Sequence, residues 1–101
     1  QSTAMRWIAI FTDTPDMLAV RAQWGNAHLA YLDQHRDEIV LAGGCRHSPE
    51  GDYVGGLWIL DVPDRARAVQ LVEQDPYFIY GARHYELRTW GKAFADRVVP
   101  L

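Results

Sequence analysis

The sequence predicts a single α+β domain in which strands and helices alternate along the chain. Two observations carry this prediction. Short segments rich in β-branched and aromatic residues are bounded by turn-forming residues, which is typical of strands. Longer segments between them repeat apolar residues at helical spacing. With 101 residues, of which 49% are hydrophobic and 23% charged, the chain has the composition of one globular domain.

The first strand is predicted at residues 6–12, which are apolar at both parities from Trp7 to Phe11. Such a run indicates burial on both faces of a sheet. A helix start follows, with Thr14 as the N-cap and Pro15 at the first helical position. The first helix is therefore expected directly after the first strand.

We expect the first helix to span residues 15–36 and to carry two rows of side chains at helical spacing. The predicted core row is aliphatic: Leu18, Ala22, Gly25, Leu29 and Leu32. The second row combines aromatic and titratable residues: Met17, Arg21, Trp24, His28, Tyr31 and His35. This row is too aromatic for a fully solvated face, so His28 is expected at the border of the core. A histidine at such a border is most often a hydrogen-bonded packing residue, and it needs a partner to act as a catalyst.

The second and third strands are predicted at residues 39–44 and 53–62, joined by a turn at residues 48–52. The adjacent Gly43 and Gly44 indicate a bulge or a close approach of another backbone segment. Both faces of the third strand are apolar, as in the first. The two strands are expected to form a hairpin.

The second helix is predicted to start at Asp64, whose side chain can cap it. Its buried side is expected to consist of Ala68, Leu71 and Val72. Pro76 ends this helix in the prediction, and the chain then turns into the last strand.

The last strand is predicted at residues 82–90, where two sets of side chains alternate. The even-numbered set is charged in His84, Glu86 and Arg88 and ends in Trp90. This set can form the polar wall of a cavity. It can equally form a cross-strand charge ladder at a solvated face or at the rim of a dimer.

The resulting order β-α-β-β-α-β is the split βαβ pattern of the ferredoxin-like class. Two helices cover only one face of a four-stranded sheet, yet the strands at residues 6–12 and 53–62 are apolar on both faces. A second copy, packed sheet against sheet, would bury the uncovered face. We therefore expect a homodimer that forms a dimeric α+β barrel.

Composition excludes several classes of partner. The net charge is −3 and the basic residues are scattered, which argues against nucleic-acid binding. No apolar run reaches the roughly 18–20 residues that cross a bilayer, so no membrane partner is expected. A single cysteine, Cys45, excludes an intrachain disulfide and favours a reducing compartment, so a cytoplasmic location is expected. Cys45 itself is expected to be a small buried residue.

No metal site is expected. His28 and His35 are separated by roughly 10 Å along the helix axis, which is too far to chelate one ion together. Neither a His-x-x-x-His nor a Cys-x-x-Cys spacing occurs in the sequence.

The chain resembles the YciI-like (YCII-related) family. The resemblance rests on an ordered set of motifs, none of which is specific by itself: Ala27–Leu32, Leu41–Gly44, Gly56–Leu60, Asp75–Tyr77 with Gly81, and Tyr85–Trp90. On this basis residues 5–90 are the YciI-like domain and residues 91–101 a C-terminal tail. Residues 1–4, ahead of Met5, look like a remnant of recombinant expression.

The resemblance implies a dimeric α+β barrel with a small cavity in each protomer. It also implies that His28 and Asp75 are the active-site pair. The best-attested activity of the family is a lyase-type reaction, the cofactor-free elimination of hydrogen chloride from a chlorinated hydroxyquinol. No cofactor is therefore expected for this chain.

With that resemblance, His28 and Asp75 are interpreted as an acid–base pair, because a carboxylate fixes the tautomer of an imidazole and stabilises its protonated form. Without it, structural roles are simpler for both. The sequence lacks a Gly-x-Ser-x-Gly nucleophile motif, so proton transfer, by elimination or isomerisation, fits better than acyl transfer.

The substrate is expected to be a small cyclic or aromatic molecule. Flat apolar walls are predicted from four aromatic residues, and a cation for a developing oxyanion is predicted from Arg88. The aromatic residues are Trp24, Tyr31, Tyr77 and Phe78. One alternative is a non-catalytic module that binds a small molecule in the same cavity. Another is a purely structural dimer in which His28 is a packed residue.

Overall fold

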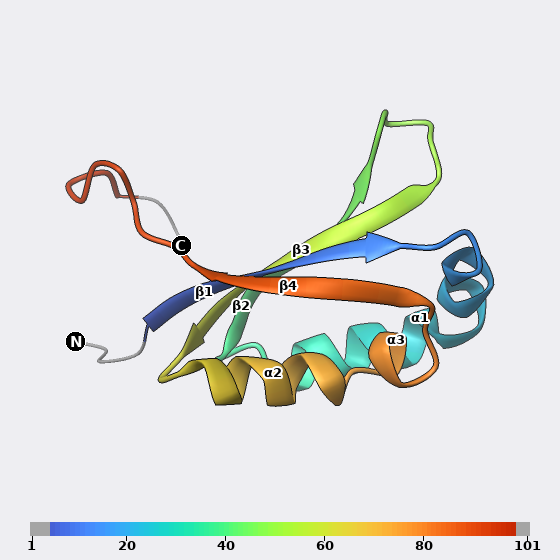
Figure 1. The fold of residues 1–101 in the computed structure, drawn as a ribbon, viewed down its shortest axis with the longest axis horizontal. Coiled ribbons are helices and arrows are strands. Elements are labelled where there is room, and N and C mark those ends of the chain that lie inside the picture. Colours follow the sequence, from blue (N-terminus) through green and yellow to red (C-terminus); the bar gives the residue numbers. More distant parts are fainter. Residues whose placement is uncertain (1–4, 99–101) are drawn as a thin grey trace.

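The computed structural model describes residues 5–98. A four-stranded antiparallel sheet, in the order β2-β3-β1-β4, carries three helices on one face (Figure 1). The elements are β1 (Met5–Asp13), α1 (Met17–Gln34), β2 (Ile39–Arg46), β3 (Tyr53–Val62), α2 (Arg65–Glu73), α3 (Pro76–Ile79) and β4 (Arg83–Thr89). Residues 1–4 and the last three residues of the predicted tail lie outside the described part of the chain.

The central strand β1 pairs with β3 on one side and with β4 on the other. Strands β2 and β3 form the predicted hairpin, with register shifts at both ends of their pairing. This hairpin extends beyond the helices (Figure 1). The α+β class and the four strands are therefore confirmed.

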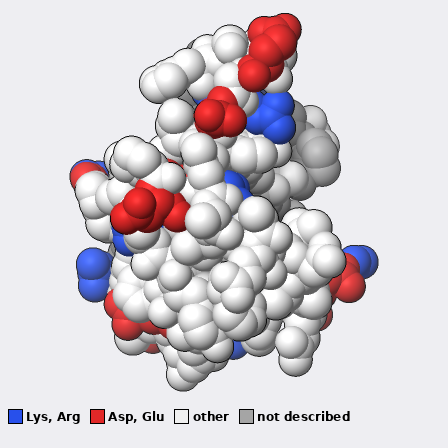
Figure 2. All heavy atoms as spheres, turned by 90° about the vertical axis from the view of Figure 1, so that its right-hand side faces the viewer, with Lys and Arg blue, Asp and Glu red and all other residues white. Residues whose placement is uncertain are grey.

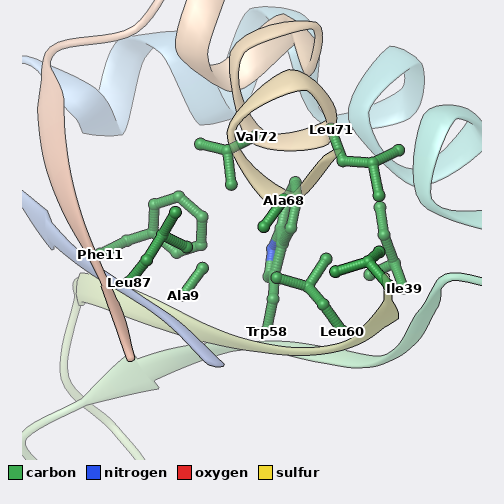
Figure 3. Packing of buried hydrophobic residues seen from close by; sticks show 10 residues of the cluster. Ala9, Phe11, Ile39, Trp58, Leu60, Ala68, Leu71, Val72 and Leu87 are labelled. Atoms are coloured by element: carbon green, nitrogen blue, oxygen red, sulfur yellow. The ribbon is translucent and has the colours of Figure 1, made fainter. Parts of the chain in front are cut away.

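The core lies between α2 and the sheet (Figure 3). The predicted residues Ala68, Leu71 and Val72 point from α2 onto Trp58 and Leu60 of β3, and all five are buried. The helix begins as predicted, because the Asp64 side chain accepts a hydrogen bond of 2.9 Å from the Arg67 backbone N–H. Burial of large apolar side chains contributes roughly 1.5–3 kcal/mol each, so this layer anchors the helices to the sheet.

The start of α1 differs from the prediction. The helix begins at Met17 with Asp16 as the N-cap residue, and the Asp16 side chain makes no capping hydrogen bond. The hydroxyl and backbone N–H of Thr14 both donate to the carbonyl oxygen of Ala82 instead. Thr14 therefore ties the loop after β1 to the start of β4 and is not available to cap the helix.

The predicted core row of α1 is also wrong in part. Leu18 and Leu29 are 40% and 62% exposed, whereas Met17 of the second row is fully buried. The second row faces the protein because its aromatic side chains bury more apolar area than the leucines do. As a result, His28 points inward.

The third helix was not predicted. The sequence around Pro76 indicates the end of a helix, but Asp75 and Pro76 also start a new one as N-cap and first helical residue. Strand β4 begins only at Arg83. The extra helix turns Asp75 and Tyr77 towards α1.

The other face of the sheet has no helix over it (Figure 1). Apolar side chains on this open face are partly exposed: Ile10 and Leu57 by 40% and Leu41 by 53%. Acidic and basic residues are scattered over the view in Figure 2 and do not gather into a basic surface. Within residues 5–98, no helix has the length and hydropathy needed to span a membrane.

Candidate active site

His28 and Asp75 are in direct contact. The Nδ1 atom of His28 on α1 lies 2.8 Å from Oδ1 of Asp75, which precedes α3. The Asp75 side chain is fully buried and the His28 side chain is 12% exposed. The predicted hydrogen bond between two residues that are 47 positions apart is thus confirmed.

Asp75 is held by the start of α3. The backbone N–H of Tyr77 donates to Asp75 Oδ1 over 3.3 Å, which makes Asp75 the N-cap of this short helix. The guanidinium Nη2 of Arg83 lies 3.5 Å from Asp75 Oδ2. A buried carboxylate needs such partners, because taking an isolated charge out of water costs several kcal/mol.

The imidazole of His28 is also held from one side by an aromatic ring. The phenol ring of Tyr77 stacks on it with 3.7 Å between the ring centroids. Burial raises the pKa of the Tyr77 phenol, so its hydroxyl stays protonated near neutral pH. Opposite this hydroxyl α1 carries Gly25, where an added Cβ would lie 3.4 Å from Tyr77 Oη.

A cavity of about 350 Å³ opens beside this pair, between α1 and the hairpin of β2 and β3. Its lining includes His28, Tyr77, Tyr53 and Trp58, together with glycines on both hairpin strands. At one of these, Gly44, an added Cβ would lie 2.5 Å from two ring atoms of Tyr53, so a larger residue would displace that ring. The glycines of the hairpin thus leave room for the ring of Tyr53, which belongs to the same hairpin.

Two arginines complete the wall of the cavity. Arg21 donates from Nε and Nη2 to Asp13 Oδ2, at 3.2 and 2.7 Å, and from Nη2 to the carbonyl oxygen of Gly55 at 3.0 Å. The guanidinium carbon of Arg83 lies 4.0 Å from the ring centroid of Phe11. Burial lowers the pKa of Arg83, an effect that the carboxylates of Asp75 and Asp13 oppose.

Of the five predicted substrate-binding residues, only Tyr77 lines this cavity. Trp24 stacks on Tyr80 at 3.9 Å. Phe78 meets the ring of Tyr85 edge-on at 5.9 Å between the centroids. These aromatic rings therefore join α1, α3 and β4 to one another.

Tyr31 is part of the packing as well. Its hydroxyl donates a hydrogen bond of 2.6 Å to the carbonyl oxygen of Leu71 on α2. Burial raises the pKa of Tyr31 to about 12, with a further contribution from the Asp75 carboxylate. This tyrosine joins α1 to α2, and the structure does not bring it to the cavity wall.

Arg88 lies on the other face of the sheet. Its guanidinium donates to Glu86 on the same strand and to the carbonyl oxygen of Leu87. The even-numbered residues of β4 are exposed and do not line this cavity. Their partners on β1, Thr12, Ile10 and Ile8, are uncharged, so they form no cross-strand charge ladder within the sheet either. Arg88 therefore does not reach the neighbourhood of His28.

The sequence prediction missed the roles of Arg21, Tyr53 and Arg83 in the cavity. A signal was present for both arginines. Arg21 belongs to the same helical row as His28, and Arg83 belongs to the odd-numbered set of β4, which is otherwise uncharged. A cation on the buried face of a strand needs an anionic partner, and such a buried ion pair indicates a functional site.

Cys45 is exposed, contrary to the predicted burial. It pairs with Gly55 of β3, next to the register shift at the end of the hairpin. Across residues 5–98, no group of three or more His, Cys, Asp or Glu side chains is close enough to hold a metal ion.

Comparison with known proteins gives two findings. The family model of the YCII-related domain matches residues 5–91. A similar solved structure is that of 5-chloro-2-hydroxyhydroquinone dehydrochlorinase (TftG) from Burkholderia phenoliruptrix AC1100, in complex with 2,5-dihydroxybenzoquinone. It is 26% identical, with a TM-score of 0.77, and the match covers 86% of this chain and 94% of the other. The search of curated proteins finds no match.

Proposed function

This chain belongs to the family of YCII-related domains, and we propose on that basis that it is a small cofactor-independent enzyme. In this proposal His28 and Asp75 transfer a proton on a small cyclic or aromatic substrate. The observation that carries it is the hydrogen bond of 2.8 Å between His28 Nδ1 and the buried Asp75, at the wall of a cavity.

The contact with Asp75 decides which nitrogen of His28 can react. An ionised carboxylate accepts a hydrogen bond from Nδ1–H, which leaves Nε2 of the neutral ring without a proton. Nε2 then acts as the base, and Asp75 stabilises the imidazolium that forms. The stack on Tyr77 and the hydrogen bond to Asp75 together hold the ring in one orientation.

The reaction class that we propose is elimination, as in the dehydrochlorinase with a similar structure. Tautomerisation of the substrate first places a hydrogen on the ring carbon that carries chlorine. His28 then takes the proton of a ring hydroxyl, the electron pair of that O–H bond moves through the adjacent ring double bond, and chloride leaves with the pair of its carbon–chlorine bond. Loss of hydrogen chloride needs no external oxidant or reductant. The volume of about 350 Å³ suits a molecule with one ring.

We also propose that the protein is a homodimer in which two open sheet faces pack into an α+β barrel. Support comes from Ile10, Leu41 and Leu57, three large apolar side chains at least 40% exposed on one helix-free face. An uncovered apolar face of this kind marks an interaction surface.

A second candidate is a module that binds a small molecule in the same cavity without converting it. Two arginines and several aromatic rings in the cavity wall support it, since they provide recognition without requiring chemistry. The enzyme would convert its ligand to a product, whereas the binding module would release it unchanged.

The deciding experiment measures release of chloride from 5-chloro-2-hydroxyhydroquinone by the purified protein. Catalytic release that depends on His28 supports the enzyme. Saturable binding of the same compound without chloride release contradicts the enzyme proposal and supports the binding module.

A further inference from the structure

The cavity beside His28 presents cations to a ligand and keeps the carboxylates behind them. Among the described residues that line it are Arg21 and Arg83, but neither Asp nor Glu. The carboxylates that face these arginines, Asp13 and Asp75, have side chains only 2% and 0% exposed. A ligand in the cavity therefore meets guanidinium groups first.

Arg83 is buried but only loosely paired. Its side chain is 4% exposed, and its closest carboxylate oxygens, on Asp75 and Asp13, are 3.5 and 3.8 Å away. Within the described residues, its Nε and Nη2 atoms have no hydrogen-bond partner. These two atoms are shut off from the surface, so the positive charge of Arg83 is compensated only by the two distant carboxylates, and it attracts an anion in the adjoining cavity.

Arg21 is held more firmly and points at the same space. Its bonds to Asp13 and to the Gly55 carbonyl fix the guanidinium at the cavity wall. The guanidinium carbons of Arg21 and Arg83 each lie 5.3 Å from the centroid of the Tyr77 ring, on which His28 stacks. One aromatic ring thus arranges both cations around the proposed base.

We propose that Arg21 and Arg83 form an anion-binding subsite of this cavity, which takes a single-ring substrate through an anionic oxygen such as a phenolate or carboxylate. The substrate class rests on the proposed function. In the reaction, an O–H bond of a ring hydroxyl breaks and the proton goes to His28; the electron pair is first held on the oxygen as an oxyanion and then moves into the ring as chloride leaves. Preorganised guanidinium groups stabilise the oxyanion that develops. The sequence predicted Arg88 as the cation that stabilises this oxyanion. In this proposal, Arg21 and Arg83 on the other face of the sheet stabilise it instead.

The test compares benzoate with benzamide, two probes of nearly the same shape that differ in charge. Isothermal titration calorimetry on the unaltered protein is expected to show benzoate binding about tenfold tighter, the ratio that one charge-assisted hydrogen bond supports. Arg83→Met and Arg21→Gln are each expected to remove most of this preference. Arg88→Met is the matched control on the same strand and is expected to keep it.

A further variant separates this subsite from the proposed chemistry. His28→Ala is expected to retain the preference for benzoate, even though it removes the proposed base. Chloride release by the unaltered protein is a separate readout, so either proposal can fail alone.

Equal affinity for the two probes in the unaltered protein would overturn the subsite, as would a lack of benzoate binding at millimolar concentrations. A preference that survives both arginine substitutions also overturns it. Circular dichroism checks the fold of each variant. Where Arg83→Met does not fold, the comparison of Arg21→Gln with Arg88→Met decides.

Discussion

The imidazole of His28 lies face to face with the phenol ring of Tyr77, with 7° between the two ring planes. The same imidazole is hydrogen-bonded to Asp75, only two residues before Tyr77. One short helix, α3, therefore places both of the groups that orient His28.

The first prediction concerns the proposed base. His28→Ala is expected to lower chloride release by about 10²–10⁴-fold, the usual contribution of a general acid or base. Asp75→Asn is expected to lower it as well, because a neutral amide stabilises an imidazolium less than a carboxylate does. Steady-state kinetics measures both. His35→Ala, at the C-cap of the same helix, is the control and is expected to keep the activity. Undiminished turnover in both site variants contradicts the pair.

The second prediction concerns the stack on Tyr77. Tyr77→Leu is expected to lower turnover by about tenfold, because an aromatic pair contributes roughly 0.5–1.5 kcal/mol and here it fixes the orientation of the imidazole. Tyr77→Phe keeps the ring and is expected to retain turnover. Equal losses in the two variants would show that the hydroxyl matters and not the stack.

The third prediction concerns the turn between α3 and β4. An added Cβ at Gly81 would overlap with the carbonyl oxygen of Tyr77, whereas at Gly91 it would meet no atom within 4 Å. Gly81→Ala is therefore expected to destabilise the fold by about 1–3 kcal/mol, while Gly91→Ala leaves stability nearly unchanged. Urea unfolding of both variants measures the difference, and similar midpoints would contradict the close approach.

The fourth prediction concerns pH and the ion pair of Glu38 with Arg67. Arg67 donates to both oxygens of Glu38, at 2.8 and 2.6 Å, and these hydrogen bonds lower the pKa of Glu38 in the folded protein. The unfolded chain therefore takes up the proton first as the pH falls. The stabilisation is fully present above the ordinary carboxylate pKa and is lost as the pH falls through the lower, folded pKa.

Glu38→Gln tests this pH dependence. At neutral pH the substitution is expected to lower the free energy of unfolding by about 0.2–1 kcal/mol. The difference from the unaltered protein is expected to shrink as the pH falls below about 4. Urea unfolding at several pH values measures it, and a difference that does not change with pH argues against a contribution from this pair.

The fifth prediction concerns the open sheet face. Leu57→Glu is expected to convert the proposed dimer into a monomer, because it places a charge among apolar side chains that a second copy would bury. Ile79→Glu changes an equally apolar residue on α3, 57% exposed, and is expected to leave the dimer intact. Light scattering coupled to size-exclusion chromatography measures both, and a monomeric unaltered protein at micromolar concentration removes the basis of the barrel.

Local patterns in the sequence were sufficient for most of the fold. The strand at Tyr53–Val62 and the helix capped by Asp64 lie where the sequence predicts them, because alternation and capping act over a few residues. The start of α1 was wrong because Thr14 bonds to Ala82, a partner far along the chain. Pro76 was interpreted as the end of α2, but it is also the first residue of α3. A proline gives the same local signal after the end of one helix and at the start of the next.

The sequence by itself determined the α+β class, the order of the four strands with α1 and α2, and the pairing of His28 with Asp75, the last through resemblance to a family. Only the tertiary structure decided which side chains share the cavity. Arg21, Tyr53 and Arg83 come from α1, β3 and β4, and no local pattern brings them together. Sheet order and helix packing place Arg88 on the opposite face and Arg83 beside Asp75. The physical reason is that adjacent strand residues point to opposite faces, so a cation's place depends on which face the helices cover.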